Sequence, residues 1–170
     1  LVRYTRFAER FEERLGAIED KTVAWIGDGN NVCASFVHAA EKLRFKLRIA
    51  TPAAYAPKSQ EIAAARAAGA DVNASNDARA AATGADVVVT DTWVSMGDAD
   101  KDARMAAFPA FAVNDDLMAT AHKDAIFLHC LPAHRGEEVS GAVIDGPQSA
   151  VWDEAENRIH AQKAVLLWCL

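Results

Sequence analysis

The sequence predicts an α/β fold, a doubly wound and mainly parallel sheet of five strands with helices on both faces. Strand-like runs alternate with helix-like runs along the chain, which is the pattern of strand–helix–strand units. One run, 85–91 (ADVVVTD), is almost wholly apolar, as expected for a strand that is buried on both faces of a parallel sheet. The length of 170 residues suits a single domain with one core.

The first two strand–helix pairs are clear. Residues 22–27 (TVAWIG) are rich in strand formers and end at a glycine, and residues 31–43 then carry apolar side chains at helical spacing. Residues 46–51 (KLRIAT) form the second expected strand. The alanine-rich run 59–69 is the second expected helix, which a glycine closes.

The rest of the chain continues the alternation. Residues 70–75 are a weaker third strand, followed by a short helix over 76–84. After the fourth strand, the pattern predicts a helix over 115–122, a fifth strand over 125–130 and one long final helix over 149–170.

Composition and charge exclude several classes of protein. The chain is 51% hydrophobic and 25% charged, with a formal net charge of −6, which argues against a nucleic-acid or anionic-membrane surface. No apolar run approaches the ~20 residues of a membrane span, and the charged start is unlike a secretory signal. Cys33, Cys130 and Cys169 do not have the spacing of a disulfide framework, so we expect a reducing, cytoplasmic location.

Unusual chemistry is concentrated at three expected strand ends: 27–31 (GDGNN), 91–97 (DTWVSMG) and 129–136 (HCLPAHRG). In doubly wound sheets, ligands bind beyond the carboxyl ends of the strands, where the strand order changes direction. These three segments are therefore the candidate site.

The GDGNN segment is a poor dinucleotide fingerprint, because Val32 stands where the third glycine would be. Asn30 is better explained as a helix cap. The amide of Asn31 can both donate and accept hydrogen bonds, which suits the α-amino and α-carboxyl groups of an amino acid. The alternative is that both asparagines only cap the helix.

The DTWVSMG segment offers a carboxylate, Asp91, followed by a loop with Ser95 and Met96. Asp91 could attract a cationic substrate, or could simply cap a backbone turn. Ser95, Met96 and the following glycine have the composition of a mobile binding loop, and a long polar loop is expected to follow. An ordinary surface loop is the alternative.

A metal site around His129, Cys130 and His134 is not expected. Adjacent residues on a strand point to opposite faces, so His129 and Cys130 cannot easily bind one ion. His122 and His160 are expected on the surface.

In the final helix, Glu154 and Arg158 form an i, i+4 pair, which by itself indicates a solvated helical face. If the start of this helix reaches the site, the Arg158 guanidinium could hold a phosphate or a carbonyl oxygen.

Taken together, GDGNN, DTWVSMG, HCLPAHRGEEV and VWDEAENRIHAQKA occur in the order and spacing of ornithine carbamoyltransferase, which the chain resembles from about residue 22 to 170. The HCLP and SMG elements are the specific ones. Aspartate-specific relatives usually lack both, and a putrescine-specific relative is expected to differ at SMG.

The resemblance implies an enzyme of arginine biosynthesis that makes citrulline and phosphate from carbamoyl phosphate and L-ornithine, with no cofactor and with a trimeric assembly. It implies that Asn31, Asp91, Ser95 and Met96 bind ornithine, and that Cys130 and Leu131 lie between the amine and the carbamoyl group. Arg158 resembles the arginine that reaches carbamoyl phosphate, and the Leu131–Pro132 bond resembles one that is cis in the family.

One part of the family pattern is missing. Neither the Ser-Thr-Arg-Thr phosphate cradle nor the His-Pro-x-Gln loop of the family occurs in the sequence. We therefore expect residues 1–170 to be the single ornithine-binding domain, with residues 1–20 as a connecting helix from a carbamoyl-phosphate domain that the sequence lacks. Such a chain should not turn over alone.

The chemistry divides the roles of Asp91 and Cys130. An amine with the lysine pKa of ~10.4 is protonated at neutral pH, and a carboxylate favours that charged form. Asp91 is therefore expected to orient the amine, while Cys130, with a reference pKa of ~8.5, accepts or relays its proton. A covalent role for Cys130 is the alternative.

Two other functions remain open from the sequence. One is a carbamoyltransferase with a different amine acceptor, and the other is a non-catalytic amino-acid-binding domain.

Overall fold

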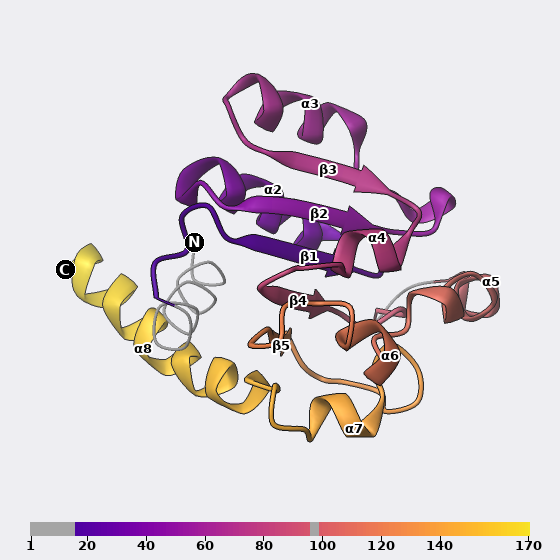
Figure 1. Ribbon diagram of the computed structural model, residues 1–170. Helices are drawn as coiled ribbons and strands as arrows, with labels where there is room; N and C mark the ends of the chain where they lie inside the picture. The colour runs from indigo at the N-terminus through magenta and orange to yellow at the C-terminus, as the bar shows by residue number, and fades with distance from the viewer. Residues whose placement is uncertain (1–15, 96–98) are drawn as a thin grey trace.

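A computed structural model describes residues 16–95 and 99–170, apart from the side chains of residues 157, 158 and 161. Five parallel strands form one sheet in the order β3-β2-β1-β4-β5, seen from top to bottom in Figure 1. Their bounds are β1 Thr22–Ile26, β2 Lys46–Ala50, β3 Val72–Ser75, β4 Val87–Thr90 and β5 Ile126–His129. The predicted fold class is confirmed, and every strand pair is parallel.

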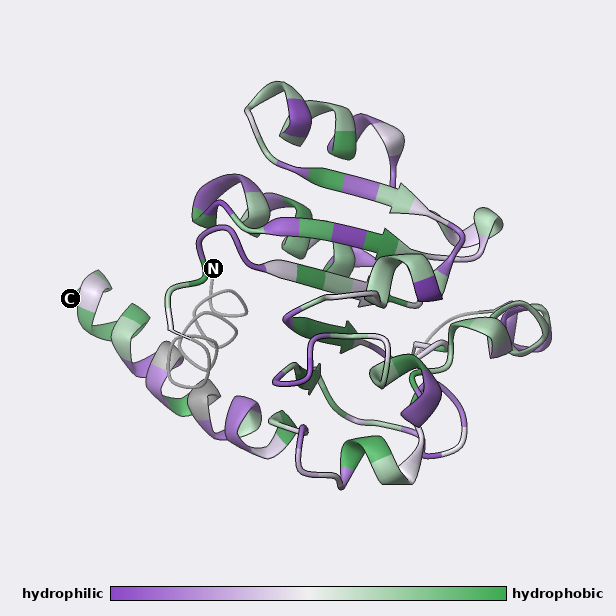
Figure 2. Ribbon diagram, in the orientation of Figure 1, coloured by the Kyte–Doolittle hydropathy of each residue, from purple (hydrophilic) through white to green (hydrophobic). Residues whose placement is uncertain are grey.

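Alternating side chains from the strands build one core on each face of the sheet. On one face, Trp25, Leu47 and Val89 pack against the helices α2 (Asn31–Leu43) and α3 (Ser59–Ala67). On the other face, the core contains residues of α4 (Ala78–Ala82), α6 (Asp115–Met118) and α7 (Gly141–Ile144). Because both faces are covered, all residues of β1, β4 and β5 are buried, and Figure 2 shows the apolar character most clearly at β4.

Short polar side chains start four of the helices. Asn30, Asp77, Asn114 and Ser140 each accept a hydrogen bond from a backbone N–H in the first turn of α2, α4, α6 and α7 respectively. These bonds satisfy donors that have no partner inside a helix. The predicted cap at Asn30 is confirmed.

Several elements differ from expectation. The segment after β4, expected to be a long polar loop, contains helix α5 (Lys101–Ala107), which has no buried residue and therefore no apolar pattern to reveal it. Helix α7 and the 3₁₀ turns η1 (Ala53–Tyr55) and η2 (Pro109–Phe111) were not predicted. The expected connecting helix over 1–20 falls mostly on residues 1–15, which lie outside the described residues.

The final helix, α8 (Val151–Cys169), begins beside β5. Phe127 donates its backbone N–H to Gln148 and accepts that of Ala150, so the segment before α8 pairs with the strand. Glu154 is buried at 8% exposure, so the helical face at this position is not the solvated one that charge spacing indicated. Among the described residues, no helix combines the length and apolar character needed to cross a bilayer.

Candidate functional site at the carboxyl ends of strands β1, β4 and β5

The three unusual segments follow three adjacent strands. Strands β1, β4 and β5 are neighbours in the sheet, so the segments that start at Gly27, Asp91 and Cys130 emerge at one edge. The chain builds outward from β1 to β2 and β3 in one direction and places β4 and β5 in the other. The strand order therefore reverses between β1 and β4, where ligands bind in folds of this kind.

Asn30 and Asp91 meet at this reversal point. Asn30 Nδ2 donates to Asp91 Oδ2 at 3.1 Å, and Asn30 Oδ1 accepts from the backbone of Val32 and Cys33. The other Asp91 oxygen accepts from the backbone N–H of Thr92 at 2.9 Å. Asp91 is 8% exposed, and its two carboxylate oxygens are held by the backbone of Thr92 and by the side chain that caps α2.

The remaining predicted ornithine-binding residues lie near this pair or outside the described residues. Asn31 is the first residue of α2 and is exposed. Ser95 is exposed at the end of the described segment that follows Asp91. Met96 lies outside the described residues.

The HCLP turn continues directly from β5. The Leu131–Pro132 bond is cis, as the resemblance implied. Cys130 is half-buried and packs against the core on the α2 face, whereas Leu131 packs against the opposite core. His129 faces the second side as well, 6.5 Å from the Phe127 ring between centroids. His129 and Cys130 thus point to opposite faces, as expected.

The side chain of Arg158 lies outside the described residues. Its backbone belongs to α8, the helix that starts beside β5. His122 and His160 are exposed, as predicted.

Sequence reasoning missed a charged cluster around Arg104. From α5, Arg104 donates to Asp28 at 2.8 Å, to the carbonyl of Trp93 at 3.0 Å and to Asp100 at 2.9 Å. Its guanidinium also lies 4.7 Å from the centre of the Tyr55 ring. These contacts join the segment after β1 to the segment after β4. The Asp100–Arg104 spacing of i, i+4 was the available signal.

Two acids show how partners change the pKa at the surface and in the interior. The side-chain bond from Arg104 holds the pKa of Asp100 below its usual value. Burial alone would raise the pKa of Glu138, but the nearby His129 ring and the backbone N–H of His134 outweigh burial and lower that pKa. Cys33 behaves differently, because burial raises the pKa of its thiol far above the ordinary value.

In the part of the chain that the structure describes, one possible metal set lies on the loop after β5. Among the described residues, ligand atoms of His134, Glu137 and Glu138 lie within 4.8 Å of one another. Glu138, however, already accepts the backbone N–H of His134 and faces His129, so it is committed to protein donors. The three free cysteines differ in solvent exposure: Cys33 is buried, Cys130 is half-buried and Cys169 is exposed.

The two glycines of GDGNN allow close contacts with other backbone and side-chain atoms of the chain itself. Gly27 has a φ of 134°, and a Cβ there would lie 3.2 Å from Thr90 Oγ1. Gly29 donates to the carbonyl of Tyr55 at 2.9 Å, and a Cβ there would collide with the backbone of 55–57. The close approach that a dinucleotide would need at Gly29 is therefore taken by the protein itself.

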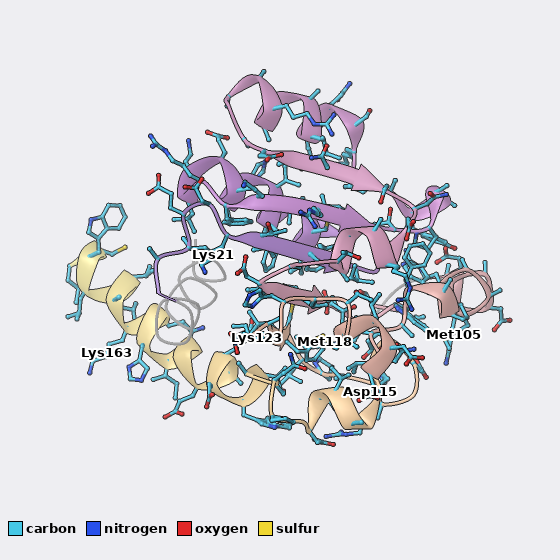
Figure 3. The ribbon with its side chains drawn as sticks, viewed as in Figure 1. Lys21, Met105, Asp115, Met118, Lys123 and Lys163 are labelled. Atoms are coloured by element: carbon cyan, nitrogen blue, oxygen red, sulfur yellow. The ribbon has the colours of Figure 1, made fainter. Side chains whose placement is uncertain are left out.

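A surface hollow of about 260 Å³ lies between α6 and α7. Asp115 and Met118 of its lining are labelled in Figure 3. None of the residues singled out at the strand ends lines it, so the strand-end edge remains the candidate site.

Comparisons with known proteins identify the family of the chain. Residues 19–169 match the family model of the aspartate/ornithine carbamoyltransferase Asp/Orn-binding domain. The chain is 60% identical over 158 residues to ornithine carbamoyltransferase of Caulobacter vibrioides, covering 93% of this chain and 51% of that protein. It is 58% identical over 160 residues to the Rhodopseudomonas palustris enzyme, covering 94% and 52%.

Solved structures that resemble the chain are also ornithine carbamoyltransferases. Ornithine carbamoyltransferase from Pyrococcus furiosus superimposes with a TM-score of 0.90 at 44% identity, over 97% of this chain and 54% of that one. The Burkholderia thailandensis enzyme gives 0.86 at 42% identity, over 97% and 52%. The chain thus spans about half the length of the relatives it matches, and it belongs to the aspartate/ornithine carbamoyltransferase family as an Asp/Orn-binding domain.

Proposed function

We propose that this chain is the ornithine-binding half of an ornithine carbamoyltransferase. The observation that carries the proposal is the meeting of three motifs at one edge, because β1, β4 and β5 are adjacent. In the proposed reaction the δ-amine nitrogen of ornithine attacks the carbamoyl carbon and a new C–N bond forms. The C–O bond to phosphate breaks, phosphate leaves, and the nitrogen loses a proton.

The roles follow the chemistry of the side chains. Asn31, Asp91, Ser95 and Met96 bind and orient ornithine, Cys130 takes the proton, and Leu131 lies beside the reacting carbon. Arg158 contacts carbamoyl phosphate. One arginine cannot align this dianion with the amine, and alignment can supply ~7–11 kcal/mol in a two-substrate reaction.

The partner of this half is proposed to be a carbamoyl-phosphate domain, with trimers in the full-length protein, a cytoplasmic location and a role in arginine biosynthesis. Helix α8 supports a docking role, since its Trp152, Ile159 and Leu166 are 56%, 66% and 66% exposed at a spacing of seven residues. Seven-residue apolar spacing is typical of a helix that packs against another helix.

The test compares the purified chain with a fusion to the half of the Caulobacter vibrioides enzyme that the chain does not match. The fusion should produce citrulline from ornithine and carbamoyl phosphate, and no carbamoylated product from putrescine or aspartate. The chain alone should be folded by circular dichroism and should produce no citrulline. Robust citrulline formation by the chain alone, or a fusion that prefers another amine, would overturn the proposal.

A further inference from the structure

A fully buried carboxylate lies directly behind the HCLP turn. Glu138 is 0% exposed and His129 is 1% exposed. Glu138 Oε1 accepts the backbone N–H of His134 at 2.5 Å and lies 3.3 Å from His129 Nε2, while Oε2 lies 3.5 Å from the His134 ring. A buried carboxylate is costly unless donors face it, so this arrangement needs a reason.

The proton on His129 can be placed from its other contact. The backbone N–H of Leu131 donates to His129 Nδ1 at 2.9 Å. A ring nitrogen that accepts a hydrogen bond carries no proton, so the proton of the neutral ring is on Nε2. Nε2 lies 3.3 Å from Glu138 Oε1, although the two atoms are not aligned as a hydrogen bond in this conformation. The adjacent acceptor oxygen favours the tautomer with the proton on Nε2, which is the tautomer that can accept from Leu131.

The segment held in this way is the one proposed to contact the reacting groups. Leu131 has a φ of 52°, a left-handed conformation that is unfavourable for a residue with a Cβ. Glu138 acts on both ends of the turn, through His129 before it and through the backbone of His134 after it. Its two contacts therefore bracket Cys130 and Leu131.

We propose that Glu138 and His129 are positioning residues for carbamoyl transfer, a role that rests on the proposed function. Glu138 fixes the His129 tautomer, His129 fixes the Leu131 N–H, and the turn presents Cys130 and Leu131 in one conformation. Neither side chain contacts substrate. The role requires a hydrogen-bond acceptor at position 138 and does not require its charge.

The first test needs only the 170-residue chain. Nitrogen-15 NMR of the histidine rings should show His129 as the Nε2–H tautomer near neutral pH. It should also show a coupling between Nδ1 and the Leu131 amide proton. The Glu138→Gln variant keeps an acceptor oxygen and should retain both signals, whereas Glu138→Leu should lose the fixed tautomer. A wild-type ring protonated at Nδ1 would overturn the proposal without any variant.

The second test uses the citrulline-forming fusion. Glu138→Leu should lower kcat on the order of 10²-fold, the effect of a small misplacement of reacting groups, with the KM for ornithine nearly unchanged. Glu138→Gln should restore most of kcat, and the neighbouring Glu137→Gln should match the wild type. Unchanged kcat in folded Glu138→Leu, or equal losses in the leucine and glutamine variants, would refute the role. If the wild-type fusion itself were inactive, the proposed function would fail, while the NMR result would still decide the geometry.

Discussion

Asn30 donates from Nδ2 to Oδ2 of Asp91 at 3.1 Å, across 61 positions of sequence. The bond joins the cap of α2 to the first residue after β4, at the point where the strand order reverses. Because the other Asp91 oxygen is bonded to the backbone of Thr92, the carboxylate has one orientation. A fixed carboxylate beside a helix cap can recognise a substrate ammonium group with little loss of side-chain entropy.

Replacing Asp91 with asparagine should weaken ornithine binding by about 1–3 kcal/mol, the range for a hydrogen bond to a charged group. Calorimetry with the fusion protein measures this. Asp86→Asn is the matched control, because Asp86 bonds the backbone of Thr22 at the other end of β4. Equal affinities in wild type and Asp91→Asn would leave Asp91 as a turn cap alone.

Replacing Cys130 with serine should lower the turnover of the fusion strongly, because a thiol of pKa ~8.5 can form the thiolate that accepts a proton, whereas a serine hydroxyl does not ionise near neutral pH. Cys169→Ser, which changes an exposed thiol, should have no effect. Mass spectrometry during turnover should find no carbamoyl group on Cys130. A trapped adduct would establish the covalent mechanism instead.

Arg104→Met should lower the free energy of unfolding by about 3 kcal/mol, because it removes the ion pair that Arg104 makes with the buried Asp28. Arg135 makes a bidentate pair with Asp145, yet both side chains are about half exposed, at 48% and 52%. Solvent screens that pair, so Arg135→Met should barely change stability. Urea denaturation followed by circular dichroism compares the two, and equal effects would count against the anchoring role of Arg104.

Gly29→Ala should destabilise the fold by about 1–3 kcal/mol, as an overpacked site does. The new Cβ would lie 2.6 Å from the carbonyl oxygen of Tyr55 and closer still to the backbone nitrogen of Pro57. Gly141→Ala is the control, because a Cβ at the start of α7 meets only Arg135 Cδ at 3.9 Å. Thermal melting of both variants is the measurement, and a Gly29→Ala melt like that of Gly141→Ala would show that the 55–57 turn can move.

Stability should depend on pH through Glu138. The folded protein lowers its pKa, so its stabilisation is present above the unfolded value of ~4.3 and is lost as the pH falls through the lower folded pKa. The stability difference between wild type and Glu138→Gln, from urea titrations, should therefore shrink as the pH is lowered from about 5. A difference that stays constant over this range would contradict the lowered pKa.

Much of the fold followed from local patterns. The strand-like runs at β1, β2, β4 and β5, alternating with helix-like runs, were enough to predict a doubly wound sheet. Asn30 was recognisable as a cap because its side-chain chemistry acts within three residues. Helix α5 escaped prediction because none of its residues is buried, and only buried faces leave a periodic apolar signal.

The sequence by itself determined which residues carry unusual chemistry, because strand ends, caps and motifs are local features. Only the tertiary structure decided which of them meet. The order β3-β2-β1-β4-β5 places the segments after β1, β4 and β5 side by side, and no periodicity encodes strand order. Glu138, in the stretch GEEV, has the sequence character of a surface charge, yet it is fully buried against His129. The burial of Glu138 depends on its packing against β5 and the HCLP turn in the folded protein. Because an unpaired buried carboxylate is costly, Glu138 must lie next to His129 and the backbone N–H of His134.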